Sequence, residues 1–369
     1  TEAATATATT TKSEIEVRTN KHVYEVVLNK KIAAIAAQQL ESEESTNNQD
    51  VDDDYSVHCE NGDTLPDPPN NEHNDVSRPR LPVLTLSTRL EEQSMAPLFD
   101  GTQWAGTRIW KAAVLGLEYI IRLRLQQQQQ QQQQSRPNTD PTPSNSYSSL
   151  LELGCGLGVP GMIWKQVLLH EYERTSNNDS PTTNPTMMSP RVVLTDRDSL
   201  LLQLETNLEH NFGTSSSDED GSSATQNKNG NHQNIVAKTL EWSTTGIQAL
   251  LQDEQQQQQQ QQQRNPDQCH ANKTVTPLFD ICLNCDCIYE PLYGRAAWEA
   301  LADVLIALAT HSPTTLLVTS VERRNSDNVE GFLQKLTTSG VVEVPIQRVV
   351  HDNSDPYHII EIYTTKGIS

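Results

Sequence analysis

Hydrophobic residues in the second half of the chain form short runs that alternate with segments of helical spacing. Runs typical of buried strands occur at residues 150–153, 191–196, 235–242, 279–285 and 314–320. Segments whose apolar side chains recur every three or four positions, as in amphipathic helices, lie at residues 162–169, 200–210, 296–309 and 329–336. This alternation predicts a parallel sheet with helices on both faces.

Two more strands complete the expected sheet near the C-terminal end, at residues 343–350 and 358–363, and we expect them to close it as an antiparallel pair. A helix over residues 110–125 precedes the first strand of the sheet. We therefore predict an α/β fold: a doubly wound, mostly parallel seven-stranded sheet with a C-terminal antiparallel hairpin.

The remaining sequence is polar. Only 35% of the 369 residues are hydrophobic, and two runs of nine glutamines interrupt the chain, Gln126–Gln134 and Gln255–Gln263. Such tracts bury too little apolar surface to offset the entropy of ordering. We expect disordered insertions at about residues 126–147, 173–190, 213–233 and 252–275. The rest suits one domain over residues 81–369, preceded by an acidic disordered linker at 41–80 and an N-terminal segment, 1–40, that is a candidate hairpin.

Acidic residues outnumber basic ones by 48 to 27, which gives a formal net charge of −21. Much of this excess lies in the expected loops, where it favours solubility; weak attraction for a basic partner is the alternative. Without a basic stripe, we expect no binding to nucleic acid. No apolar stretch reaches 18 residues, so we expect no membrane span. Free thiols and the lack of a secretory hydrophobic region favour a cytoplasmic location, with the nucleus as a second compartment.

The strongest motif follows the first strand, at Glu152-Leu-Gly-Cys-Gly-Leu-Gly158. Its glycines allow a sharp turn and the close approach of a ligand. A strand, a glycine-rich turn and a helix form the first unit of a nucleotide site in a doubly wound sheet. A dinucleotide site needs G-x-G-x-x-G, which the frame Gly156-x-Gly158-x-x-Gly161 satisfies. A turn that binds no ligand is the other alternative.

Aromatic and acidic side chains at the ends of later strands are candidate ligand contacts. Asp196 ends the second strand, where its carboxylate could accept hydrogen bonds from ribose hydroxyls. Its alternative role, which Asp198 could share, is to cap the next helix. Trp242 ends the third strand and could pack over an adenine ring or seal the end of the sheet. Trp110 lies at the start of its helix and, taken alone, is a candidate for the core.

Four of the six cysteines occur late in the chain. The spacing Cys282-x-x-Cys285-x-Cys287, with Cys269 and His270 upstream, is compatible with a zinc site. However, residues 279–285 have the pattern of a buried strand, in which small free cysteines pack as apolar side chains. We therefore expect no bound metal.

Asp286-Cys-Ile-Tyr289 follows the fourth strand, at the usual position for chemistry in this fold. The glycine motif after the first strand resembles that of class I S-adenosylmethionine-dependent methyltransferases. Among those enzymes, the ones that methylate planar amide or adenine nitrogens have an Asn-Pro-Pro-Tyr type motif after the fourth strand, and this chain has none. It also has no second pair of acids placed to hold a guanidinium, as arginine methyltransferases do. Both observations argue against these substrate classes.

The motifs occur in an order that resembles a known family. Glu152-x-Gly154-x-Gly156-x-Gly158 is similar to motif I of class I S-adenosylmethionine-dependent methyltransferases. The whole set is similar to the seven-β-strand protein lysine methyltransferases of methyltransferase family 16, the methyltransferase-like 21 relatives. It includes Trp110-x-Ala-Ala113, Thr195-Asp196, Leu240-Glu-Trp242, Cys285-Asp-Cys-Ile-Tyr289 and Ser320-Val-Glu-Arg-Arg324. The resemblance covers about residues 81–363, apart from the insertions.

This resemblance implies the class I methyltransferase fold and S-adenosyl-L-methionine as the cofactor. The residues that would contact the cofactor are Trp110, Glu152, Gly154, Cys155, Gly156, Gly158, Asp196, Trp242 and Cys285. Asp286 and Tyr289 would match the family's Asp-x-x-Tyr motif beside the acceptor, as catalytic residues. The implied enzyme is a monomer that methylates a lysine of a non-histone protein. The alternatives are methylation of a histidine or a small molecule, and a non-catalytic binding module of the same fold.

Overall fold

The computed structural model describes residues 15–20, 23–28, 83–87, 106, 109–134, 147–178, 191–213, 234–264, 277–352 and 358–368. A three-stranded sheet has the order β1-β2-β3, with β1 at Ile15–Asn20, β2 at Val23–Leu28 and β3 at Val83–Ser87. The predicted acidic linker, 41–80, lies outside the described residues, as do residues 179–190 of the predicted insertion 173–190 and residues 214–233 of the predicted insertion 213–233. Residues 173–178 are helical. The boundaries predicted for these segments stay predictions.

The main sheet has seven strands in the order β6-β5-β4-β7-β8-β10-β9. Their bounds are β4 Leu150–Leu153, β5 Val192–Asp196, β6 Ile235–Thr239, β7 Ile281–Cys285, β8 Leu316–Arg323, β9 Gln347–Asp352 and β10 Ile359–Thr365. Strands β4 to β8 pair in parallel, whereas β10 is antiparallel to both β8 and β9. The predicted doubly wound sheet with a closing antiparallel hairpin is confirmed.

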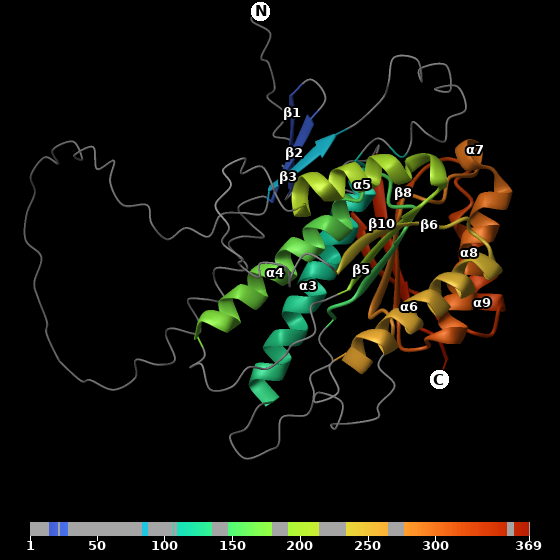
Figure 1. The fold of residues 1–369 in the computed structure, drawn as a ribbon. Helices are drawn as coiled ribbons and strands as arrows, with labels where there is room; N and C mark the ends of the chain where they lie inside the picture. The colour runs from blue at the N-terminus through green and yellow to red at the C-terminus, as the bar shows by residue number, and fades with distance from the viewer. Residues whose placement is uncertain are drawn as a thin grey trace, which may run out of the picture. The chain divides into compact units, whose positions relative to one another are not determined.

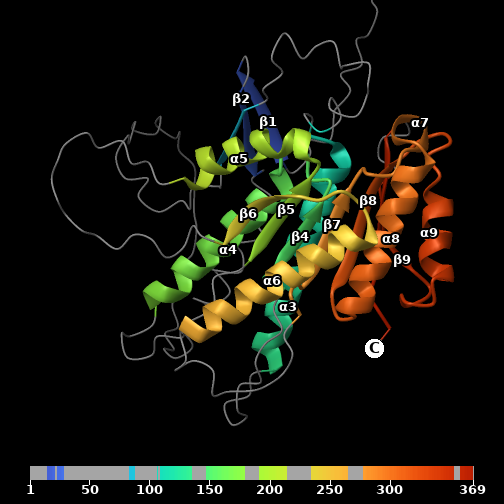
Figure 2. The same cartoon turned by 45° about the vertical axis from the view of Figure 1, so that its right-hand side comes forward.

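Helices cover both faces of this sheet (Figures 1 and 2). One face carries α3 Lys111–Gln134, α4 Val159–Asn178 and α5 Asp198–Phe212. The other carries α6 Thr244–Arg264, α8 Arg295–His311 and α9 Val329–Thr338, and the short helix α7, Glu290–Tyr293, precedes α8. Among the described helices, none combines the length and the apolar character needed to cross a membrane.

The strand pattern follows from this two-sided burial. All four residues of β4 are buried, and successive side chains point to opposite faces. Leu151 and Leu153 belong to the core cluster that includes residues of α6, α8 and α9. Glu152 points the other way, toward α4, where it meets the backbone of Gly161. A strand buried on both faces is hydrophobic almost throughout, so the single acid in β4 marks a special position.

Both glutamine runs differ from the predicted disordered insertions. Gln126–Gln134 continues α3 and Gln255–Gln263 continues α6. Glutamine is a good helix former, and extending an existing helix avoids the cost of nucleation. The second run also begins beside a buried anchor: Glu254 is 2% exposed and pairs with Arg191 at 2.8 Å and Lys238 at 2.7 Å. This helix therefore starts as part of the packed domain.

Candidate active site

A cavity lies at the carboxyl ends of β4, β5 and β7, where the strand order reverses. In an open α/β sheet this reversal leaves a crevice for ligands. The cavity encloses about 390 Å³, which falls within the range of about 300–1,000 Å³ for small-molecule sites. Nine of the eleven predicted site residues line it: Trp110, Glu152, Gly154, Cys155, Gly156, Asp196, Trp242, Cys285 and Asp286.

The turn after β4 is closely packed. Gly154 and Gly156 have φ values of +62° and +54°, in the left-handed region that other residues rarely adopt. A Cβ atom on Gly156 would lie 2.9 Å from the carbonyl oxygen of Gly106, and one on Gly154 would lie 3.0 Å from the ring of Trp242. Gly158 is not among the residues that line the cavity. It packs instead against leucines of α5 and β5, so its predicted cofactor contact is replaced by core packing.

Asp196 holds this turn from the neighbouring strand. Its Oδ2 accepts a hydrogen bond from the N–H of Gly156 at 2.7 Å, and its Oδ1 accepts one from the N–H of Arg197 at 2.8 Å. Burial raises the pKa of Asp196, and the two hydrogen bonds oppose the rise. Because each carboxylate oxygen has two lone pairs, one on each remains for a ligand hydroxyl. The N-cap of α5 is Arg197, so the capping alternative for Asp196 is not observed.

Glu152 lines the same cavity from β4 and is 2% exposed. Its Oε2 accepts a hydrogen bond from the N–H of Gly161 at 2.8 Å, in the first turn of α4. Burial raises the pKa of Glu152 to about 8; this hydrogen bond opposes the rise, and the charge of Asp196 adds to it. Glu152 is therefore largely protonated at neutral pH, which removes one negative charge from the cavity.

Apolar and uncharged groups make up much of the remaining wall. Trp242 is half-buried and packs against the core cluster while its ring lies beside Gly154, so it seals this end of the sheet. Its packing over an adenine ring stays a prediction. Burial raises the pKa values of the Cys155 and Cys285 thiols well above their usual range, which keeps them uncharged. Cys287 also lines the cavity, and its Sγ donates to the carbonyl oxygen of Leu153 at 3.6 Å. That contact links the residues after β7 to the end of β4.

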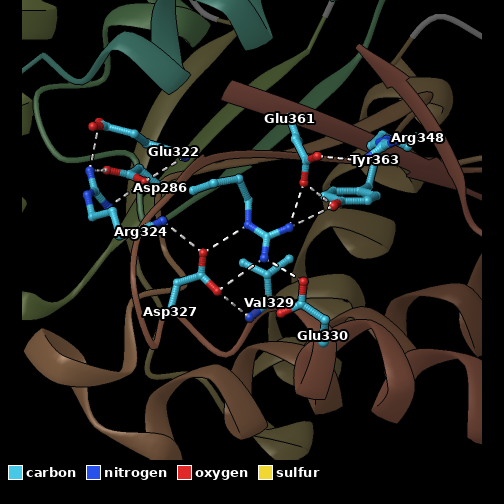
Figure 3. Close-up of polar contacts among 10 residues, drawn as sticks. Asp286, Glu322, Arg324, Asp327, Val329, Glu330, Arg348, Glu361 and Tyr363 are labelled. Atoms are coloured by element: carbon cyan, nitrogen blue, oxygen red, sulfur yellow. Dashed lines mark hydrogen bonds and ion pairs between the residues drawn. The ribbon is translucent and has the colours of Figure 1, made fainter. Parts of the chain in front are cut away.

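Asp286 follows β7 and is paired with Arg324, the residue after β8. The guanidinium Nη1 and Nη2 donate to Oδ1 and Oδ2 of Asp286 at 3.0 and 2.7 Å, and the N–H of Glu322 donates to Oδ1 at 3.2 Å (Figure 3). Burial raises the pKa of Asp286, and the guanidinium opposes the rise. The sequence predicts a carboxylate available to an acceptor amine. In the structure this carboxylate forms a buried ion pair with Arg324, and its contact with an acceptor amine stays a prediction.

Tyr289 differs from its predicted position as a wall of the acceptor channel. It is not among the residues that line the cavity, and its ring lies 5.1 Å from the guanidinium carbon of Arg324. Tyr293, in α7, lines the cavity instead. Tyr289 and Tyr293 are one helical turn apart, so the spacing in the sequence contained a signal for the second tyrosine.

Several other lining residues were not anticipated. They include Gly106, Arg197, Glu241 and three alanines of α8, Ala296, Ala297 and Ala300. The alanines provide a small-residue surface, and their grouping at the start of a predicted helix is visible in the sequence. Arg197 directly follows Asp196 and Glu241 directly precedes Trp242, and neither position has a local pattern that indicates a ligand contact.

The zinc alternative is not supported within the described ranges, where no three side chains that could ligate a metal come together. Cys282 is fully buried in β7, and burial raises the pKa values of the Cys282 and Cys287 thiols strongly. A zinc ligand needs the opposite, a deprotonated thiolate. Cys269 and His270 lie outside the described residues.

The chemistry of the cavity fits S-adenosylmethionine. Asp196 has lone pairs for two ribose hydroxyls, and Trp242 and Leu240 provide apolar surface beside it for a flat base. The turn at Gly154 and Gly156 has no side chains, which leaves its backbone open to the amino-acid part of the ligand. A dinucleotide would place its pyrophosphate on the N-terminus of α4, but there the N–H of Gly161 already donates to Glu152, which argues against the dinucleotide alternative at this turn.

The strand order and this cavity define the class of protein as a class I methyltransferase, and S-adenosyl-L-methionine is its cofactor. Residues 91–259 match the family model described as lysine methyltransferase, Methyltransf_16. Over slightly less than half of its length, the chain is thus similar to the lysine methyltransferase family. It is also 33% identical over 142 residues to the secreted RxLR effector protein 48 of Plasmopara viticola. That match covers 38% of this chain and 57% of the relative's length.

Solved structures of methyltransferases align with the chain at low sequence identity and low TM-score. A TehB-like S-adenosylmethionine-dependent methyltransferase from Corynebacterium glutamicum aligns with 75% of this chain and 97% of its own, at 10% identity and a TM-score of 0.33. The mitomycin 7-O-methyltransferase MmcR aligns with 75% of this chain and 56% of its own, at 8% identity and a TM-score of 0.33. Similarity at this level carries no information about the substrate.

Proposed function

We propose that this chain transfers a methyl group from S-adenosylmethionine to the side chain of a lysine in a protein other than a histone. The family match supports the acceptor type. The observation that carries the proposal is the placement of Asp196 and Asp286 on either side of the glycine turn. They follow β5 and β7, the two neighbours of β4. Asp196 would hold the cofactor, and Asp286 would face the acceptor.

S-adenosylmethionine supplies an electrophilic methyl group on a sulfonium, and the residues of the chain position the two reactants. Alignment of an in-line displacement supplies most of the acceleration in such a reaction. A lysine can attack only as a neutral amine, although its free pKa is about 10.4. The neutral thiols, the protonated Glu152 and the apolar wall provide an environment that disfavours an ammonium ion. A positioned general base is therefore not required of Asp286.

Two alternatives use the same cavity. A histidine or a small molecule as the acceptor would leave the cofactor residues unchanged. A non-catalytic binding module would have no need of the buried Asp286–Arg324 pair, because leaving two charges in a buried position is costly. We favour the enzyme over the module for this reason.

We further propose that the enzyme works as a monomer in the cytoplasm and nucleus, on a protein partner, without binding nucleic acid or membranes. The net charge of −21 favours a basic partner over a polyanion. The buried reduced thiols, Cys155, Cys282, Cys285 and Cys287, fit a reducing compartment. Sedimentation of the purified protein and imaging of a tagged chain would test the oligomeric state and the location.

The decisive experiment is to incubate the protein with heat-treated lysate and methyl-labelled S-adenosylmethionine. Label in acid-precipitable protein that is recovered as methyl-lysine after hydrolysis supports the proposal. Methyl-histidine or label only in the soluble fraction supports the two alternative acceptors, and no label above the Gly156→Arg control supports the binding module. A parallel reaction with purified core histones tests the non-histone assignment, which strong histone labelling would overturn.

A further inference from the structure

We propose that Arg324 is a positioning residue that controls the protonation of the acceptor amine, because its pairing with Asp286 prevents that carboxylate from holding an ammonium ion. This role rests on the proposed methyl transfer to an amine. It explains why the acid nearest the acceptor is neutralised by a cation of the same chain.

The first argument is the occupancy of the carboxylate. A carboxylate can accept about four hydrogen bonds. Asp286 already accepts three, two from Arg324 at 3.0 and 2.7 Å and one from the N–H of Glu322 at 3.2 Å. One lone pair, on Oδ2, remains for a substrate. Asp286 can thus orient an amine by one hydrogen bond, but its charge is already matched by a guanidinium.

The second argument is that Arg324 is held firmly in place. Its guanidinium carbon lies 5.4 Å from the ring of Trp110 and 5.1 Å from the ring of Tyr289, which places the cation between two aromatic faces. Its backbone N–H donates to Oδ2 of Asp327 at 2.9 Å. Trp110 itself lines the cavity, so Arg324 links the cofactor wall to the acceptor side. Figure 3 shows how the arginine and its acidic partners converge.

The third argument concerns the other charged groups near Asp286. Arg324 also donates to Oε2 of Glu322 at 2.8 Å, and the other oxygen of Glu322 lies 2.6 Å from Nδ1 of His358. The other charged or ionisable acid and base side chains that line the cavity are Asp196, on β5, Glu152, on β4, Arg197 and Glu241. Cys285, Cys287 and Tyr293 also border the cavity, and burial raises the pKa of each above its usual range, which keeps them uncharged. Among the residues that the structure describes, Arg324 is therefore the cation in direct contact with Asp286.

Replacing Arg324 by a neutral residue should raise the pKa of the acceptor amine. An opposite charge within about 4–6 Å of an ionisable group shifts its pKa by about 1–3 units toward the charged form. With Arg324 replaced by a neutral residue, Asp286 would stabilise an ammonium. The reaction would then need a higher pH to reach the neutral amine.

The test measures the initial rate of methyl-lysine formation against pH, from 6.5 to 10, with saturating heat-treated lysate protein. Under saturation the midpoint of the profile reports ionisation within the bound complex. In Arg324→Gln we expect the midpoint to rise by about 1–3 pH units. Arg324→Lys keeps the charge, so its midpoint should stay near that of the unmodified protein even where its rate is lower.

Asp286→Asn keeps the shape of the side chain and removes the negative charge. Its midpoint should stay unchanged or move to lower pH, which provides an independent test if Arg324→Gln does not fold. A midpoint that moves to higher pH in Asp286→Asn, or a rate too low to measure at any pH, would overturn the proposal. So would an unmoved midpoint in folded Arg324→Gln.

Arg323→Gln is the matched control. Arg323 is the adjacent arginine, similarly buried, and it pairs with Asp327, Glu330 and Glu361 instead of Asp286. This variant should lose thermal stability without moving the midpoint. If the unmodified protein methylates no amine at any pH, the proposed function fails; if it is active and all midpoints coincide, only the role of Arg324 fails.

Discussion

The carboxylate of Asp196 accepts a hydrogen bond from the backbone N–H of Gly156 across 2.7 Å, although the two residues are 40 positions apart. The contact fixes the glycine turn after β4 against the end of β5. It therefore gives one acid two functions, to hold the turn and to present its remaining lone pairs to a ligand. A substitution of Asp196 should therefore both loosen the glycine turn and remove hydrogen-bond acceptors for the ligand.

Asp196→Ala should weaken binding of S-adenosylmethionine by about 10- to 100-fold, since hydrogen bonds to a charged group contribute about 1.5–3 kcal/mol each. Calorimetry on the purified variant would measure this. The control is Asp198→Ala, because Asp198 is an exposed acid in the first turn of α5. Equal losses of affinity in both variants would contradict the assignment of Asp196 to the cofactor.

Gly156→Ala should destabilise the protein and weaken cofactor binding. An alanine there would adopt a left-handed conformation, which costs about 1–2 kcal/mol, and its Cβ would lie 2.9 Å from the carbonyl oxygen of Gly106. Gly340→Ala separates the two effects, because Gly340 also has a positive φ, +68°, but no atom within 4 Å of the added carbon. Both variants should lose stability, but only Gly156→Ala should lose affinity for S-adenosylmethionine. Titration of both variants with the cofactor tests this.

Glu254→Ala should lower the free energy of unfolding by about 3–5 kcal/mol, because it leaves Arg191 and Lys238 without their buried partner. The adjacent Asp253 is largely exposed, so Asp253→Ala should cost less than about 1 kcal/mol. Deletion of residues 258–263 should also cost little, since it shortens the far end of α6 beyond this anchor. Thermal melting of the three variants tests the order, and a larger loss from the deletion than from Glu254→Ala would contradict it.

Glu152 should make stability depend on pH. Burial raises its pKa from 4.5 to about 8, so the folded protein keeps a proton that the unfolded chain loses above pH 4.5. The stabilisation is complete below pH 4.5 and is lost as the pH rises to about 8, with a slope of at most about 1.4 kcal/mol per unit. Glu152→Gln should flatten this slope. Urea unfolding from pH 5 to 8 measures it, and parallel curves for the two proteins would exclude a raised pKa for Glu152.

The sequence was sufficient to predict features that depend on local spacing. Alternating runs of apolar residues indicated the strands and helices of the main sheet, because each element has a fixed period. The glycines after β4 and the acid that ends β5 were recognisable for the same reason, since a turn and a strand end are local features. These two motifs also indicated the cofactor, and both line the cavity.

The glutamine runs show where composition is insufficient. Polar repeats are typical of disordered segments, yet each of these runs follows an amphipathic helix that is already packed on the sheet. A helix that has been nucleated can be extended at little cost, and this depends on the preceding residues. The composition of a glutamine run gives no information on whether a packed helix precedes it.

Only the tertiary structure determined which side chains meet in the site. Arg324 and Asp286 are 38 residues apart, and Tyr289, although close to Asp286 in sequence, packs on the arginine instead of facing the cavity. The sequence thus determined the sheet, the glycine turn and which residues lie at the ends of the strands. The partners of those residues were decided by the pairing of β7 with β8 and by the path of the loops beyond them. Contacts between distant residues depend on the order of the strands, which no local pattern encodes.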